Sequence, residues 1–135
     1  MKLIKIISHP ATLIICFLLV LISGQHLGGF YLLYILLGLP HGAVHSILGV
    51  MGVGILLFSH YKYKRAFIYM IEPLLNIAGV ILLGLSLFLF FYNDRSQYNY
   101  STFYETLPQI SMVLFAFLIA SFLVINLIKL RQVAT

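Results

Sequence analysis

Four long apolar runs dominate this sequence and leave it few folds to adopt. Only 8% of its 135 residues are charged, whereas a soluble domain carries about 25% charged residues. Because so few charges cannot cover the apolar surface against water, the expected environment is a lipid bilayer. A membrane span needs roughly 20 apolar residues. The sequence therefore predicts an all-α membrane protein, a single polytopic domain over 1–135 with four transmembrane helices at approximately 6–24, 28–59, 66–93 and 107–130.

The basic residues predict how the chain is oriented. Only Arg95 falls on one predicted side of the membrane. The others share the second side: Lys2, Lys5, Lys62, Lys64, Arg65, Lys129 and Arg131. Basic segments are retained in the cytoplasm during insertion, so both termini are expected there, in a bacterial-type inner (plasma) membrane. The net charge of +5 is then an orientation signal, and its scatter over three short segments argues against nucleic-acid binding.

The N-terminal segment has a second interpretation. Its basic start, apolar stretch and small residues are also typical of a signal peptide. Ile22 lies three places before a cut after Gly24, where a small residue is preferred, so an uncleaved first span is favoured.

The second run is too long for one straight span. As a helix, 28–59 would be about 48 Å long, against a hydrocarbon core of about 30 Å. Pro40 removes one backbone hydrogen bond and crowds the preceding turn. One interpretation is a tilted helix kinked near Pro40. The other is a helix broken there, with a short segment 28–37 near the outer interface and a membrane-crossing part at approximately 39–59. Both alternatives stay open; His41 is expected near the outer surface, as it would be if the span ends near Ser59.

Two histidines four residues apart, His41 and His45, are expected on one face of this helix. Such a pair can hold a metal ion with both rings, but zinc requires three or four protein ligands. His26 in the predicted outer loop is a candidate third ligand, and the third and fourth spans contain no histidine to complete a haem site. No cofactor is expected in the main hypothesis. A metal- or haem-binding redox subunit using these three histidines is the alternative.

A second polar group is expected at the cytoplasmic side, formed by His9, His60, Glu72 and Asn76. An acid within the membrane is costly and needs a partner, which His9, His60 or the basic segment 62–65 would supply. Glu72 is either a proton- or substrate-handling acid or a helix-start carboxylate that the helix dipole favours. The second interpretation is favoured. The first makes a small transporter component a further alternative.

Two resemblances rest on particular features of the chain. The string GLPHGA at 38–43 resembles the opening helix motif of bacterial membrane β-carotene oxygenases, whose histidine in this segment is assigned to iron binding. The likeness implies that role for His41, although His45 stands where those enzymes commonly carry an acid. In size and span number, the chain resembles the small four-span exosortase-associated membrane proteins. That resemblance implies a non-enzymatic helper of a membrane processing enzyme.

Small residues recur along the second run and predict that this helix packs closely against another helix. Gly38, Gly42, Ser46 and Gly49 follow one another at three- and four-residue spacing, which lets helices approach closely. The sequence has no nucleophile–base pair, phosphate loop or carboxylate cluster, so no catalytic residue is assigned. The main hypothesis is therefore a multi-pass accessory or assembly protein. Its second helix would pack against a membrane-protein partner or a second copy of the chain.

Overall fold

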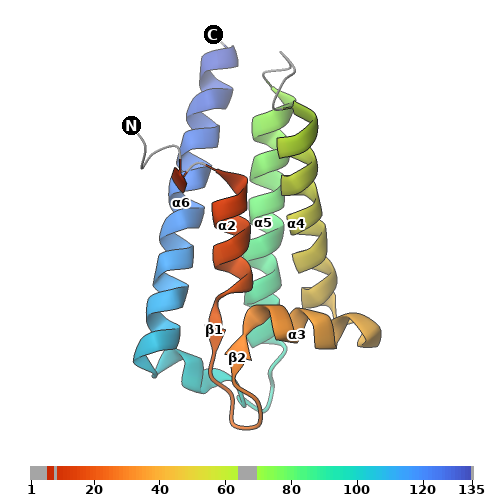
Figure 1. The fold of residues 1–135 in the computed structure, drawn as a ribbon, viewed down its shortest axis with the longest axis vertical. Helices are drawn as coiled ribbons and strands as arrows, with labels where there is room; N and C mark the ends of the chain where they lie inside the picture. Colours follow the sequence, from red (N-terminus) through yellow and green to blue (C-terminus); the bar gives the residue numbers. More distant parts are fainter. Residues whose placement is uncertain (1–5, 8, 64–69, 135) are drawn as a thin grey trace.

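The structure is a computed structural model that describes residues 6–7, 9–63 and 70–134. Figure 1 shows a bundle of upright helices with α3 lying across its lower end. In chain order the elements are α2 (Pro10–Leu18), β1 (Leu21–Ile22), β2 (Gly29–Phe30), α3 (Tyr31–Gly38), the 3-10 helix η1 (Leu39–His41), α4 (Val44–Tyr63), α5 (Ile71–Tyr92), the 3-10 helix η2 (Tyr100–Phe103) and α6 (Thr106–Ala134). We call the end with β1, β2, α3 and η2 the hairpin end. The opposite end holds the last turn of α4 and the first turn of α5.

Three of the described helices are long and apolar enough to cross a bilayer: Val44–Lys62 in α4, Ile71–Tyr92 in α5 and Thr106–Gln132 in α6. The shortest of these elements, α4, has 20 residues and is about 30 Å long, the thickness of a hydrocarbon core. These helices confirm the helical membrane class and correspond to the second, third and fourth predicted spans. Residues 66–69 of the predicted third span lie outside the described residues.

The first predicted span, 6–24, is not a continuous helix, so four full-length transmembrane helices are not confirmed. Its described helix, Pro10–Leu18, has 9 residues and is about 14 Å long. The backbone is then extended at β1, because its N–H groups bond to side chains of distant elements instead of to a preceding helical turn. Leu21 N–H, for example, donates to Ser111 Oγ at 2.9 Å. Non-helical backbone is tolerated at membrane depth where protein covers it, and Ile22 is buried.

The second predicted span is broken rather than kinked, which decides between the two alternatives that the sequence left open. α3 lies across the hairpin end (Figure 1), and η1 follows with Pro40 in its first turn. Gly42 then adopts φ 64°, a left-handed conformation that ends helices and favours glycine. Ala43 N–H donates to Gly38 O at 3.0 Å and closes the turn. The membrane-crossing helix consequently begins at Val44, later than the predicted 39.

The antiparallel helices α4 and α5 pack side by side through opposed glycines. An ideal Cβ placed on Gly52 would lie 2.9 Å from Gly79 O, and one on Gly79 would lie 3.2 Å from Gly52 O. Such contacts require that neither residue has a side chain. The aromatic part of the core lies where α2, α3 and α6 meet. There the ring of Phe17 lies 5.2 Å from that of Tyr31 and 5.5 Å from that of Phe115.

Candidate functional site

His41 and His45 lie in different elements and have different surroundings. His41, in η1, is exposed, and its Nδ1 lies 2.9 Å from Leu37 O of the preceding turn. His45, in α4, is half-buried with its ring 5.2 Å from the ring of Phe90. Its Nε2 has no hydrogen-bond partner among the described residues. The predicted stacking of the two histidines on one helix face is wrong, because the left-handed Gly42 separates η1 from α4.

His26 lies in the turn between β1 and β2, where its ring is 4.7 Å from that of Tyr98. Within the ranges 6–7, 9–63 and 70–134, no group of three or more His, Cys, Asp or Glu side chains gathers closely enough to hold a metal ion. The metal- or haem-binding alternative remains a prediction, and the positions of His26, His41 and His45 add no support to it.

Three of the four residues predicted for helix packing face the inside of this chain. An ideal Cβ on Gly38 would meet Ser46 Oγ, and one on Gly49 would lie 2.9 Å from Ser86 Oγ. Ser46 is fully buried. Gly42 is exposed, with no described atom within 4 Å of an ideal Cβ. The small-residue spacing therefore serves packing within the chain, while contact of these four residues with a partner stays a prediction.

At the opposite end, two of the predicted polar residues find partners on α6. The buried Asn76 donates through Nδ2 to Asn126 Oδ1 at 3.0 Å, and Asn126 Nδ2 donates to Phe122 O at 2.8 Å. Glu72 lies in the first turn of α5, as the helix-start interpretation expects, with Oε1 3.5 Å from Lys129 Nζ. Sequence reasoning missed both α6 partners. Their depth could have indicated them, since Asn126 and Lys129 lie near the same predicted membrane surface as Glu72 and Asn76.

The other two predicted members of this group, His9 and His60, contact each other. Their ring centroids lie 4.5 Å apart with the ring planes at 61°. His9 also caps α2, because its Nδ1 accepts a hydrogen bond from Ala11 N–H at 3.2 Å. The pair ties the start of α2 to the last turn of α4. Of the predicted basic partners, Lys64 and Arg65 lie outside the described residues.

Replacing His9 by alanine is expected to lower the free energy of unfolding by about 1 kcal/mol, the usual cost of losing a side-chain N-cap. His9→Asn retains an acceptor for the Ala11 N–H and is expected to recover most of this loss. Thermal unfolding in detergent, followed by far-UV circular dichroism, compares the two variants. Equal losses in both would show that contact with His60, rather than the cap, stabilises this junction.

The loop between α5 and α6 uses both of its carboxylates internally. Asp94 accepts hydrogen bonds from Asn99 N–H at 2.8 Å and from Asn99 Nδ2 at 3.1 Å. Glu105 accepts from Ser23 Oγ at 2.6 Å, which joins the loop to the segment after α2. Burial raises the pKa of Tyr34 above its ordinary value, and the negative charge of Asp94 raises it further. The hydroxyl of Tyr34 donates a hydrogen bond to Leu27 O.

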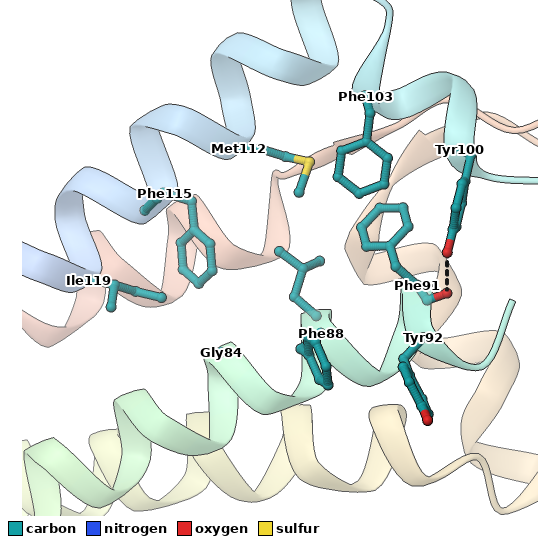
Figure 2. A pocket seen from close by; sticks show the side chains of 11 residues that line it. Gly84, Phe88, Phe91, Tyr92, Tyr100, Phe103, Met112, Phe115 and Ile119 are labelled. Carbon is teal, nitrogen blue, oxygen red and sulfur yellow. Dashed lines mark hydrogen bonds between the residues drawn. The ribbon is translucent and has the colours of Figure 1, made fainter. Parts of the chain in front are cut away.

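An apolar groove lies between α5 and α6 near the hairpin end, and sequence reasoning did not predict it (Figure 2). Its volume is about 490 Å³. The ring of Phe91 on α5 lies 4.6 Å from that of Phe103 on η2, and both line the hairpin end of the groove. Gly84 leaves open space, with no described atom within 4 Å of an ideal Cβ, and the small Ala116 lines the groove from α6. The groove exists because these two helices present small residues where they pack loosely.

Comparisons with known protein families, with curated proteins and with solved structures find no match to this chain. The fold therefore defines only a general class of protein. The chain is a helical membrane protein with three helices of spanning length in its described part. A short strand pair and a transverse helix cover the hairpin end of the bundle.

Proposed function

We propose that this protein is a small, non-enzymatic accessory or assembly subunit that docks on another membrane-spanning helix through the outward face of α4. The observation that supports this proposal is Gly54, which is exposed and has no described atom within 4 Å of an ideal Cβ. Val50 and Leu57 are exposed about one turn to either side. A glycine between large apolar residues lets a second helix approach closely.

The exposed residues of α4 repeat at the spacing of a helix-pairing seam. Ile47, Val50, Gly54, Leu57 and Tyr61 are all exposed and follow one another at intervals of three, four, three and four residues. This is the spacing of the core positions in paired helices that cross at about 20°. The second helix thus keeps the docking role expected from the sequence. The proposed contact moves from the inward Gly38, Ser46 and Gly49 to the outward seam.

The orientation proposed for the chain follows from its basic residues. We place it in a bacterial-type inner membrane, with both termini in the cytoplasm and the hairpin end outside. This requires an even number of crossings. The first crossing would be made by α2 together with the chain from Val20 to Gly24, since five residues add at most roughly 17 Å to a helix of about 14 Å. The described Arg95, in the loop at the hairpin end, is then the exception among the basic residues.

The resemblance to exosortase-associated proteins suggests the kind of partner, a larger membrane enzyme that this subunit would help to assemble or stabilise. A second copy of the chain is the other partner consistent with an α4 seam. The transporter alternative requires Glu72 and the break near Pro40 to act together. They lie at opposite ends of the bundle, so the described contacts do not favour it.

Site-specific photocrosslinking in living cells tests the proposal. A photoreactive amino acid replaces Met51, which is exposed beside the seam, and we expect a discrete protein adduct. Gly54→Leu is expected to reduce its yield about fivefold, which corresponds to about 1 kcal/mol of lost association energy. Coexpression of two differently tagged copies shows whether the adduct contains a second copy of the chain.

Gly84→Leu is the matched control, because Gly84 also has open space around an ideal Cβ but lies on α5 beside the groove. It should leave the Met51 adduct unchanged. Adducts with lipid alone, or an equal yield of protein adduct in wild type and Gly54→Leu, would refute docking at this face.

A further inference from the structure

We propose that the groove between α5 and α6 binds one acyl chain of an anionic phospholipid, with the lipid head group at Arg95. This site is separate from the α4 seam, and the two proposals can fail independently.

The position and lining of the groove indicate a hydrocarbon chain as its ligand. The groove is open to the side between two helices of membrane-spanning length, so bilayer lipids are the molecules that meet it. Apolar side chains make nearly all of its surface; Phe88, Met112 and Ile119 are examples from its two walls (Figure 2). Its volume of about 490 Å³ falls within the range of roughly 300–1,000 Å³ typical of small-molecule sites.

The polar groups of the lining, the hydroxyls of two tyrosines, lie at the hairpin end of the groove. Tyr92 lies in the last turn of α5, and its ring stacks on that of Phe88 with a centroid distance of 5.7 Å. Both rings are largely exposed and line the groove. The hydroxyl of Tyr100, on η2, donates to Phe91 O at 3.5 Å. Tyrosine favours the head-group layer, so the Tyr92 end of the groove is expected at the depth where an acyl chain joins its head group.

The basic residue closest in the chain to this end of the groove is Arg95, which we assign to the lipid head group. It lies in the loop between Tyr92 and Tyr100, two residues that line the groove, and its side chain is exposed. Asp94 and Glu105 are held by other hydrogen bonds. Neither of them forms an ion pair with Arg95 in the described part of the chain. A guanidinium group binds phosphate oxygens through two parallel hydrogen bonds, so a phospholipid with net negative charge suits this position.

Lipid photolabelling tests the site directly. The full chain is reconstituted into vesicles of phosphatidylethanolamine and phosphatidylglycerol. A phosphatidylglycerol tracer carries a photoreactive diazirine on its acyl chain, and mass spectrometry locates the label after digestion. We expect label at Phe88, Met112 and Ala116 in excess of label at Val50, which is exposed on α4. Gly84→Leu should lower labelling of the groove about tenfold, the change that corresponds to about 1.4 kcal/mol.

Further variants separate lipid binding from folding and from partner docking. Ala116→Leu fills the groove from its other wall and should act like Gly84→Leu. Arg95→Gln should remove the preference for the phosphatidylglycerol tracer over an equivalent phosphatidylethanolamine tracer, while groove labelling persists. Gly54→Leu is the control for the α4 seam and should leave groove labelling unchanged.

Even labelling of groove and α4 positions would overturn the proposal, as would labelling that survives both filling variants. A protein adduct formed from a photoreactive residue at Ala116 in cells would also overturn it, because a partner helix would then occupy the groove. Loss of the Met51 adduct in Gly54→Leu alongside normal groove labelling would support both proposed sites.

Discussion

Replacing Gly79 by leucine is expected to lower the free energy of unfolding by about 3 kcal/mol or more, the upper range for overpacking a well-packed core. An ideal Cβ at this position would already lie 2.7 Å from Leu56 Cγ and 3.2 Å from Gly52 O. The first contact could be relieved by a side-chain rotation. The second is with backbone and requires α4 and α5 to separate. Since the fully buried Leu56 and Leu83 lie around this crossing, the separation would open the centre of the bundle.

Thermal or denaturant unfolding in detergent, followed by circular dichroism, measures this loss. Gly84→Leu is the control in the same helix, where a leucine meets open space and also gains helix propensity of roughly 1 kcal/mol over glycine. Gly79→Leu should therefore unfold well before wild type, whereas Gly84→Leu should not. Unfolding of Gly79→Leu at the wild-type midpoint would contradict the close crossing of α4 and α5.

Local sequence signals predicted the long helices and the break, but could not predict the end of the first helix. The length of the apolar runs alone located α4, α5 and α6. Pro40 and its flanking glycines marked the break between α3 and α4. The extended chain after Leu18 depends on hydroxyl groups far along the sequence. Ser111 lies 90 residues beyond Leu21 in the chain, and its Oγ takes the Leu21 N–H. No pattern within residues 6–24 contains that information.

For the candidate sites, the sequence likewise indicated which residues matter but not which way they face in the fold. The spacing of Gly38, Ser46 and Gly49 correctly marked a close-packed surface, but in a uniformly apolar helix the pattern cannot say which face is inside. Gly54 is also a glycine of α4, yet it is exposed, whereas Gly49 is buried. The groove was harder still to predict, because it depends on how far two helices separate. The polar residues were informative about depth but not about pairing: His9 and His60 were expected as partners of Glu72, yet they contact each other while Glu72 lies beside Lys129.

Truncating Tyr31 to alanine is expected to lower the free energy of unfolding by about 3–5 kcal/mol, the range measured for large aromatic residues in cores. Tyr31 is completely buried at the start of α3. Its ring lies 5.3 Å from that of Phe90, and its hydroxyl oxygen lies 2.9 Å from Ser86 Oγ and 3.0 Å from Ser86 O. Ser86 Oγ in turn donates to His45 O at 2.6 Å. One side chain therefore links the transverse helix to both α5 and α4.

Tyr31→Phe separates the two contributions, because it keeps the ring and removes only the hydroxyl. It is expected to cost about 1–2 kcal/mol, the loss of a buried hydrogen bond. A double-mutant cycle with Ser86→Ala, measured by unfolding in detergent, should show coupling of at least about 0.5 kcal/mol. Additive losses would mean that the two hydroxyls act separately. α3 would then be held at the hairpin end by its aromatic contacts with Phe90 of α5.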